Sequence, residues 1–173
     1  MQQFNIGLVF DQKVTSQVIE YAEKLYQQVP SKIFLGRNSM PHLTVIQFTS
    51  EESEKDYIWS KCKKMSIDKP TIILSGLTIL PSSNGGAWIE TSILKSAELL
   101  KIHELIITCL PSNLTPDNDT GDKYRPHITV ARVSKPIKTI SVPIEYNLLR
   151  LNNVKCRLAI GIGTSFEPCL EII

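Results

Sequence analysis

The sequence predicts an α+β fold built from two similar halves. A pattern of Pro, His, an aliphatic residue, Thr and Val occurs twice, at residues 41–45 and 126–130. In each half, one predicted strand and one predicted helix precede the pattern. Because internal repetition determines architecture, we expect a duplicated lobe whose copies close face to face around a pseudo-twofold axis. The chain is then one two-lobed domain, residues 1–173, with halves at about 1–85 and 86–173.

The elements of the first half follow from the spacing of apolar residues. Apolar runs rich in β-branched side chains indicate strands, whereas apolar residues at helical spacing indicate helices. Pro30 ends the first helix, and a turn-forming cluster at residues 81–86 ends the half. The predicted strands are residues 4–10, 42–48 and 71–80, and the predicted helices are residues 14–28 and 51–64.

The second half begins with the same order of elements. A strand at residues 87–94 and a helix at residues 96–110 lead through a polar loop at 111–125 to the second pattern. We expect this acidic loop to lie at the mouth of any cleft between the halves. The remaining predicted strands are residues 142–151, 154–163 and 170–173.

Each copy of the pattern gives its strand one polar and one apolar face. Residues two apart on a strand point to the same side. His42 and Thr44 therefore project together, as do His127 and Thr129. If the two halves face each other, these four side chains meet in one cleft.

Two histidines in one cleft form a general acid–base pair. A neutral imidazole accepts a proton and an imidazolium donates one, and an unperturbed pKa of about 6.5 makes both forms available. Threonine hydroxyls can donate hydrogen bonds to anionic oxygens. A tetrahedral phosphate held by the threonines would have one histidine to activate its attacking nucleophile and another to protonate its leaving oxygen. This chemistry needs no nucleophilic Ser or Cys and no metal.

Other interpretations of the polar residues are weaker. A single His-x-Thr on a strand is usually structural, but two copies at matching positions are hard to explain in that way. We expect His103, which lacks such a pattern, at the surface or the edge of the core. A zinc site of His42, His103 and His127 would lack the cysteines, carboxylates or neighbouring histidines that zinc favours. We therefore expect no metal and no cofactor.

Composition excludes several classes of protein. The net charge of +2 is nearly balanced, so composition alone does not indicate a nucleic-acid-binding protein. The four cysteines include no Cys-x-x-Cys spacing and are predicted to be reduced thiols of a cytoplasmic protein. No apolar run approaches the roughly 20 residues of a membrane span.

The chain resembles the 2H phosphoesterase superfamily, also called the LigT-like or 2′,5′-RNA ligase family. That family is defined by two His-x-Thr/Ser-x motifs with apolar x, which residues 42–45 and 127–130 fit. The resemblance covers almost the whole chain and implies a two-lobed fold with antiparallel sheets lining a central cleft and helices on the outside. It also implies hydrolysis of 2′,3′-cyclic phosphates, 1″,2″-cyclic ADP-ribose phosphates or 2′,5′-phosphodiesters, or the sealing of RNA ends through 2′,5′ linkages.

The resemblance further indicates two substrate-binding residues. Tyr124 lies three residues before His127, where the family often has an aromatic residue that could stack on a base. Arg132 lies five residues after His127, where an arginine often lies near the phosphate. Strict alternation places Arg132 on the face opposite His127, so only a bulge or a strong twist would bring it round.

Together, these observations predict a metal-independent hydrolase, a cyclic nucleotide or RNA phosphodiesterase that acts as a monomer away from membranes. Its catalytic residues would be His42, Thr44, His127 and Thr129. Its substrate would be a nucleotide or RNA with a cyclic phosphate or a 2′,5′ linkage, and 2′,5′-RNA ligase activity would be a related reaction. The alternative is a non-catalytic nucleotide- or RNA-binding module on the same fold. Binding alone needs cations and hydroxyls rather than paired titrating groups.

Overall fold

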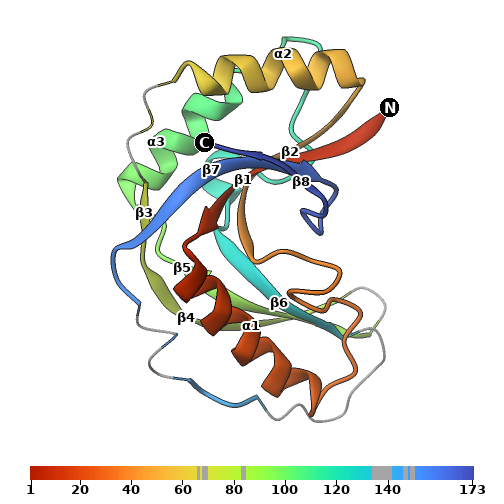
Figure 1. Cartoon of the computed structure of the whole chain (residues 1–173), viewed down its shortest axis with the longest axis vertical. Coiled ribbons are helices and arrows are strands. Elements are labelled where there is room, and N and C mark those ends of the chain that lie inside the picture. Colours follow the sequence, from red (N-terminus) through yellow and green to blue (C-terminus); the bar gives the residue numbers. More distant parts are fainter. Residues whose placement is uncertain (66, 68–69, 83–84, 134–141, 146–147, 149–150) are drawn as a thin grey trace.

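A computed structural model describes residues 1–65, 67, 70–82, 85–133, 142–145, 148 and 151–173 (Figure 1). Its helices are α1 (Gln12–Tyr26), α2 (Glu52–Lys63), α3 (Ala97–Ile107) and the short 3₁₀ helix η1 (Gly121–Lys123). Its strands are β1 (Gln2–Phe10), β2 (His42–Ser50), β3 (Thr71–Ile72), β4 (Leu74–Pro81), β5 (Ala87–Ile93), β6 (His127–Val133), β7 (Val154–Ile162) and β8 (Cys169–Ile172).

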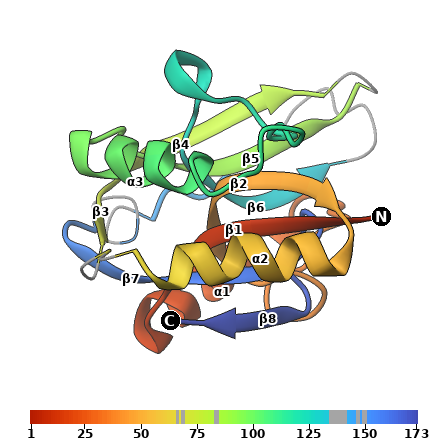
Figure 2. The same ribbon diagram turned by 90° about the horizontal axis from the view of Figure 1, so that it is seen from above.

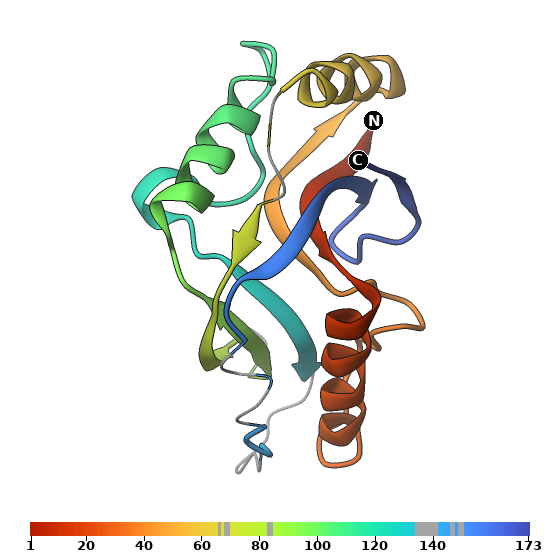
Figure 3. The same ribbon diagram turned by 60° about the vertical axis from the view of Figure 1, so that its left-hand side comes forward.

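The strands form two antiparallel sheets. The first has the order β2-β1-β7-β3, with β8 also paired to β7, and the second has the order β4-β5-β6. The two strands that carry the His-Thr pattern, β2 and β6, each end the strand order of their sheet and contact each other. Figures 2 and 3 show the helices on the outside of the sheets. The predicted α+β fold with antiparallel sheets is thereby confirmed.

One continuous apolar core joins the two sheets and the helices. Helix α1 shows how the sequence builds it. The Asp11 carboxylate accepts a hydrogen bond from the Val14 backbone N–H at 2.9 Å and starts the helix. Val14, Val18 and Leu25 then recur on one face and are buried. Full burial of each such side chain stabilises the folded state by about 1.5–3 kcal/mol relative to leaving it exposed. None of the helices within the described residues is long and apolar enough to cross a membrane.

The strand predicted over residues 142–151 is wrong at residues 142–145, which have no regular secondary structure. The Pro143 carbonyl accepts a hydrogen bond from the Tyr21 hydroxyl of α1 at 3.0 Å, so a side chain takes the place of a strand partner. Proline also lacks the N–H that a sheet ladder needs. Residues 146–147 and 149–150 of this prediction lie outside the described part of the chain.

Each motif strand contains a β-bulge directly after its threonine. In β2, Thr44 pairs with Gly7 and Ile46 with Ile6, so Val45 is the extra residue. In β6, Thr129 pairs with Glu90 and Ala131 with Ile89, so Val130 is the extra residue. An extra residue reverses the alternation of side chains beyond it. The residue five positions after each histidine therefore returns to the side of the histidine.

Two helices satisfy the carbonyl groups of the bulge residues, and each helix comes from the opposite half of the chain. The Tyr26 hydroxyl, on α1, donates to the Val130 carbonyl at 3.0 Å. The His103 ring, on α3, donates from Nδ1 to the Val45 carbonyl at 2.9 Å. Helix α1 also packs against β6, and helix α3 against β2. These crossed contacts bind the two sheets together, because a buried polar group without a partner costs about 1–3 kcal/mol.

His103 lies deeper than the sequence indicates. Its side chain is fully buried, and its ring stacks on the Tyr124 ring with a centroid distance of 3.9 Å. Burial lowers the pKa of His103, which keeps the ring neutral with its proton on the Nδ1 that donates. The predicted position at the surface or core edge is therefore wrong, because the ring serves as an internal hydrogen-bond donor.

The crossed contacts predict the effect of Tyr26→Phe. The substitution removes the donor to Val130 and the acceptor of the Leu35 backbone N–H, which lies 2.8 Å from the hydroxyl. We expect the free energy of unfolding, measured with urea, to fall by about 1–3 kcal/mol. Tyr57→Phe on α2, where the side chain is 53% exposed, is the control and should change it by less than about 0.5 kcal/mol. Equal effects of the two substitutions would contradict this account of the helix contacts.

Candidate active site

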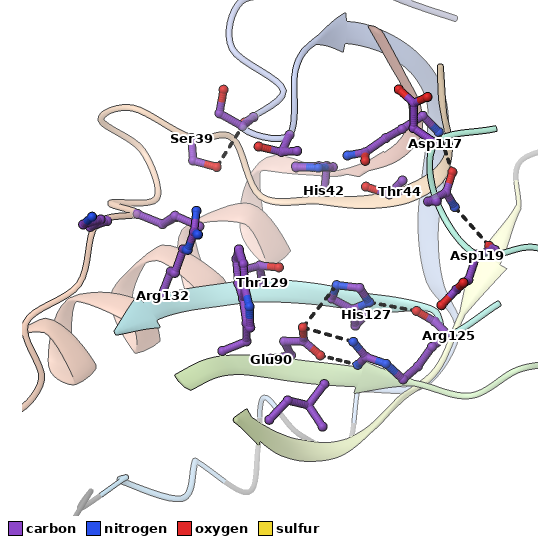
Figure 4. A pocket seen from close by; sticks show the side chains of 18 of the residues that line it. Ser39, His42, Thr44, Glu90, Asp117, Asp119, Arg125, His127, Thr129 and Arg132 are labelled. Carbon is purple, nitrogen blue, oxygen red and sulfur yellow. Dashed lines mark hydrogen bonds and ion pairs between the residues drawn. The ribbon is translucent and has the colours of Figure 1, made fainter. Parts of the chain in front are cut away.

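A cleft of about 620 Å³ lies between the two sheets and contains the four residues of the twin pattern. His42 and Thr44 face it from β2, and His127 and Thr129 face it from β6 (Figure 4). The contact between the two edge strands β2 and β6 thus brings together side chains that lie half a chain apart in sequence. A tetrahedral anion is far smaller than this cleft, so there is room for a nucleotide around it.

The same local contact orients both imidazole rings. Nδ1 of His42 lies 2.6 Å from the Met40 carbonyl oxygen, and Nδ1 of His127 lies 2.8 Å from the Arg125 carbonyl oxygen. In each copy the carbonyl belongs to the residue before the proline, which proline restricts to an extended conformation. Because a carbonyl can only accept, each ring carries a proton on Nδ1 and directs its chemistry through Nε2.

His42 has surroundings that favour the neutral ring. It stacks on Phe166 with a centroid distance of 4.6 Å, and its Nε2 lies 3.2 Å from the Asn5 amide nitrogen. Burial lowers the pKa of His42 to about 4, and repulsion from His127 adds to this effect, although the bond to the Met40 carbonyl opposes it. At neutral pH, Nε2 of His42 is therefore an unprotonated acceptor.

The two threonines are able to donate hydrogen bonds into the cleft. The Thr44 hydroxyl oxygen accepts from the Asn5 amide at 3.0 Å, which leaves its own O–H as a donor. Within the described part of the chain, no hydrogen bond occupies the Thr129 hydroxyl, which also lines the cleft. Both hydroxyls can therefore bind an anionic oxygen.

His127 has a carboxylate neighbour instead of an aromatic one. Its Nε2 lies 3.4 Å from Oε1 of Glu90, whose side chain is only 4% exposed. Arg125 holds this carboxylate with both of its terminal nitrogens, one of them 3.2 Å from Oε1. Sequence analysis did not identify Glu90 or Arg125. The signal that could have found them is an acidic residue in the middle of strand β5, because carboxylates are rarely buried without a partner.

The two residues indicated as substrate-binding differ in position. Arg132 lines the cleft because of the bulge in β6, and its guanidinium lies 4.5 Å from the centre of the Trp88 ring. Tyr124 borders the cleft but is only 4% exposed, and its ring is covered by His103. Its hydroxyl donates to the Thr44 carbonyl at 2.9 Å. This position favours a role in fixing β2 over stacking on a base.

The ends of the cleft differ in charge. Arg132 lies at one end, and Asp117 and Asp119 lie at the other (Figure 4). Lys32 also lines the cleft and donates its backbone N–H to the Arg132 carbonyl at 2.9 Å. The backbone N–H of Asp117 donates to the Gln47 carbonyl at 2.7 Å, which attaches the acidic loop to the edge of β2. Among the described residues, no group of three His, Cys, Asp or Glu side chains is placed to hold a metal ion.

Three solved structures, described below, share the fold of this chain. LigT from E. coli in complex with 3′-AMP has a TM-score of 0.62 at 12% identity, covering 99% of this chain and 96% of that chain. A protein described as a phosphoesterase has a TM-score of 0.61 at 12% identity, covering 99% and 97%. Usb1 from Kluyveromyces marxianus with uridine monophosphate has a TM-score of 0.55 at 14% identity, covering 99% and 96%.

Sequence comparison identifies the family. No curated protein matches the chain significantly. Residues 15–151, which are most of the chain, match the sequence model of the 2′-5′ RNA ligase superfamily. This match and the shared fold confirm the resemblance that the twin patterns indicate: the chain belongs to the 2′-5′ RNA ligase superfamily and has the fold of the 2H phosphoesterases.

Proposed function

We propose that the protein is a metal-independent phosphoesterase that acts on 2′,3′-cyclic phosphates or 2′,5′-linked nucleotides through His42 and His127. One observation carries this proposal: both imidazole rings line the same cleft, and each ring is held by a hydrogen bond from Nδ1, which leaves its Nε2 free for chemistry. The nucleotides bound by LigT and Usb1 support a nucleotide as the substrate. Paired acid–base groups distinguish this site from one that only binds.

The geometry supports a single-step transfer of the phosphoryl group to water. The hydroxyls of Thr44 and Thr129 hold the phosphate oxygens. One imidazole takes a proton from water as the water oxygen bonds to phosphorus. The other imidazole gives a proton to the ester oxygen as its bond to phosphorus breaks. The product is a phosphomonoester, and solvent returns the two rings to their starting protonation states.

The charges in the cleft favour one orientation of the substrate. Arg132 and Lys32 can bind further phosphates, whereas Asp117 and Asp119 at the other end repel them. We therefore propose that a nucleotide chain leaves the reacting phosphate toward Arg132. Stacking of the guanidinium on Trp88 holds its donors in a plane that matches two phosphate oxygens.

Turnover of a substrate panel tests the proposed function. The panel contains 2′,3′-cyclic nucleotides, 2′,5′-oligoadenylate and 1″,2″-cyclic ADP-ribose phosphate. We expect hydrolysis of at least one substrate that persists in a chelator, and losses of roughly 10²- to 10⁴-fold for His42→Ala and for His127→Ala. Unfolding curves of both variants serve as the control for folding. Tight binding of a panel compound without any product would instead establish the binding-module alternative.

Arg132→Lys tests the proposed orientation. Replacing a planar, two-pronged donor by a point charge should raise KM about tenfold or more for a dinucleotide that ends in a 2′,3′-cyclic phosphate, because its internucleotide phosphate lies beyond the reacting one. A mononucleotide 2′,3′-cyclic phosphate, which has no further phosphate, should be affected much less. Arg157→Lys on β7, an exposed residue outside the cleft, is the matched control and should leave both substrates unaffected. If Arg132→Lys affects both substrates equally, no further phosphate binds at the Arg132 end of the cleft, and the proposed orientation is wrong.

A further inference from the structure

The two halves of the molecule differ at the position beside each motif threonine. Thr44 pairs with Gly7 on β1, and Thr129 pairs with Glu90 on β5. Both pairs lie next to the bulge of their strand, so Gly7 and Glu90 occupy equivalent positions. One histidine site therefore has no side chain where the other has a carboxylate.

An aromatic ring takes the space beside Gly7. A Cβ atom on Gly7 would lie 2.7 Å from the Leu43 carbonyl oxygen and 3.1 Å from the Phe166 ring. The same Phe166 ring is fully buried and stacks on His42. This arrangement leaves no room for a charged side chain on this side of His42 and places the apolar Phe166 ring there instead.

The carboxylate of Glu90 is both buried and fixed. It is held by Arg125 through both oxygens, while Oε1 also faces Nε2 of His127 at 3.4 Å (Figure 4). A neighbouring anion favours the protonated form of an imidazole. A charge-assisted N–H···O bond is usually about 2.7–2.9 Å long. The contact at 3.4 Å therefore attracts a proton to Nε2 without engaging it fully, and 27% of the His127 side chain remains exposed.

We propose that Glu90 is a positioning residue that keeps a proton on Nε2 of His127, so that His127 is the general acid and His42 the general base. This inference rests on the proposed function. The Arg125 guanidinium, which binds the same carboxylate, opposes the proton, whereas Asp119, which also lines the cleft, favours it. His42 is uncharged at neutral pH and adds no charge of its own. Glu90 decides between them because its Oε1 lies closest to the reacting nitrogen and is shielded from solvent.

The assignment gives the reaction a direction. Water replaces the Asn5 amide at Nε2 of His42 and loses a proton to that nitrogen as its oxygen bonds to phosphorus. The ester oxygen departs with the electron pair of its bond to phosphorus and takes the Nε2 proton of His127. The Nδ1 protons of both rings stay on Nδ1 throughout, hydrogen-bonded to the Met40 and Arg125 carbonyl oxygens.

Nitrogen NMR of the histidine rings tests the proton assignment without any substrate. In the wild-type protein, we expect His127 to keep its Nε2 proton at pH values where His42 has already lost its own. In Glu90→Gln, His127 should lose this proton at a lower pH than in the wild-type protein, because the anion beside Nε2 has been removed. Glu20→Gln, an exposed residue on α1, is the matched control and should shift neither ring. If Glu90→Gln does not fold, the order in which His42 and His127 of the wild-type protein lose their Nε2 protons decides the assignment.

Rate profiles connect the assignment to catalysis. On the panel substrate that turns over, kcat/KM should fall at low pH as His42 becomes protonated and at high pH as His127 loses its proton. Glu90→Gln should move only the high-pH limb, to lower pH. A proton that stays longer on His42 than on His127, or a Glu90→Gln profile identical to that of the wild type, overturns the inference and leaves the phosphoesterase proposal standing. The expected NMR order without turnover of any panel substrate would overturn the phosphoesterase proposal alone.

Discussion

The paired β-bulges at Val45 and Val130 are the constraint on which the rest of the structure depends. Each bulge places a histidine, a threonine and the residue five positions after the histidine on one face of an edge strand. Each also leaves a carbonyl that needs a buried donor. Those donors come from Tyr26 and His103 on helices of the opposite half. The feature that shapes the cleft therefore also joins the two sheets that line it.

Within this near symmetry, the two histidine sites are chemically unequal. Both imidazole rings donate from Nδ1 to a backbone carbonyl two residues earlier, that of Met40 for His42 and that of Arg125 for His127. The second neighbour of His42 is Phe166, and that of His127 is Glu90. A duplicated site with identical surroundings would give both imidazoles similar proton affinities. The proposed chemistry uses one neutral and one protonated imidazole, and the presence of Glu90 where the other site has Gly7 favours that difference.

Sequence periodicity was sufficient for the fold class, the order of most elements and the meeting of the four motif residues, because these follow from local pattern and repetition. It was not sufficient for the site's surroundings. Strict alternation along the strand would point Arg132 away from the cleft. The bulge that directs its side chain into the cleft is visible only in the register of β5 with β6. Glu90 and Phe166 reach the histidines through pairings distant in sequence. Tyr124 and His103 pack on each other, which no motif spacing indicates.

The central claim is that His42 and His127 act on the same phosphate in the same step. A double-variant cycle measures this directly, with rates of the wild type, His42→Ala, His127→Ala and the combined variant on one substrate. Because each group is useful only while the other is present, the account predicts that the combined variant loses about as much activity as the worse single variant. Losses that multiply would show that the two imidazoles contribute independently, and would contradict the account.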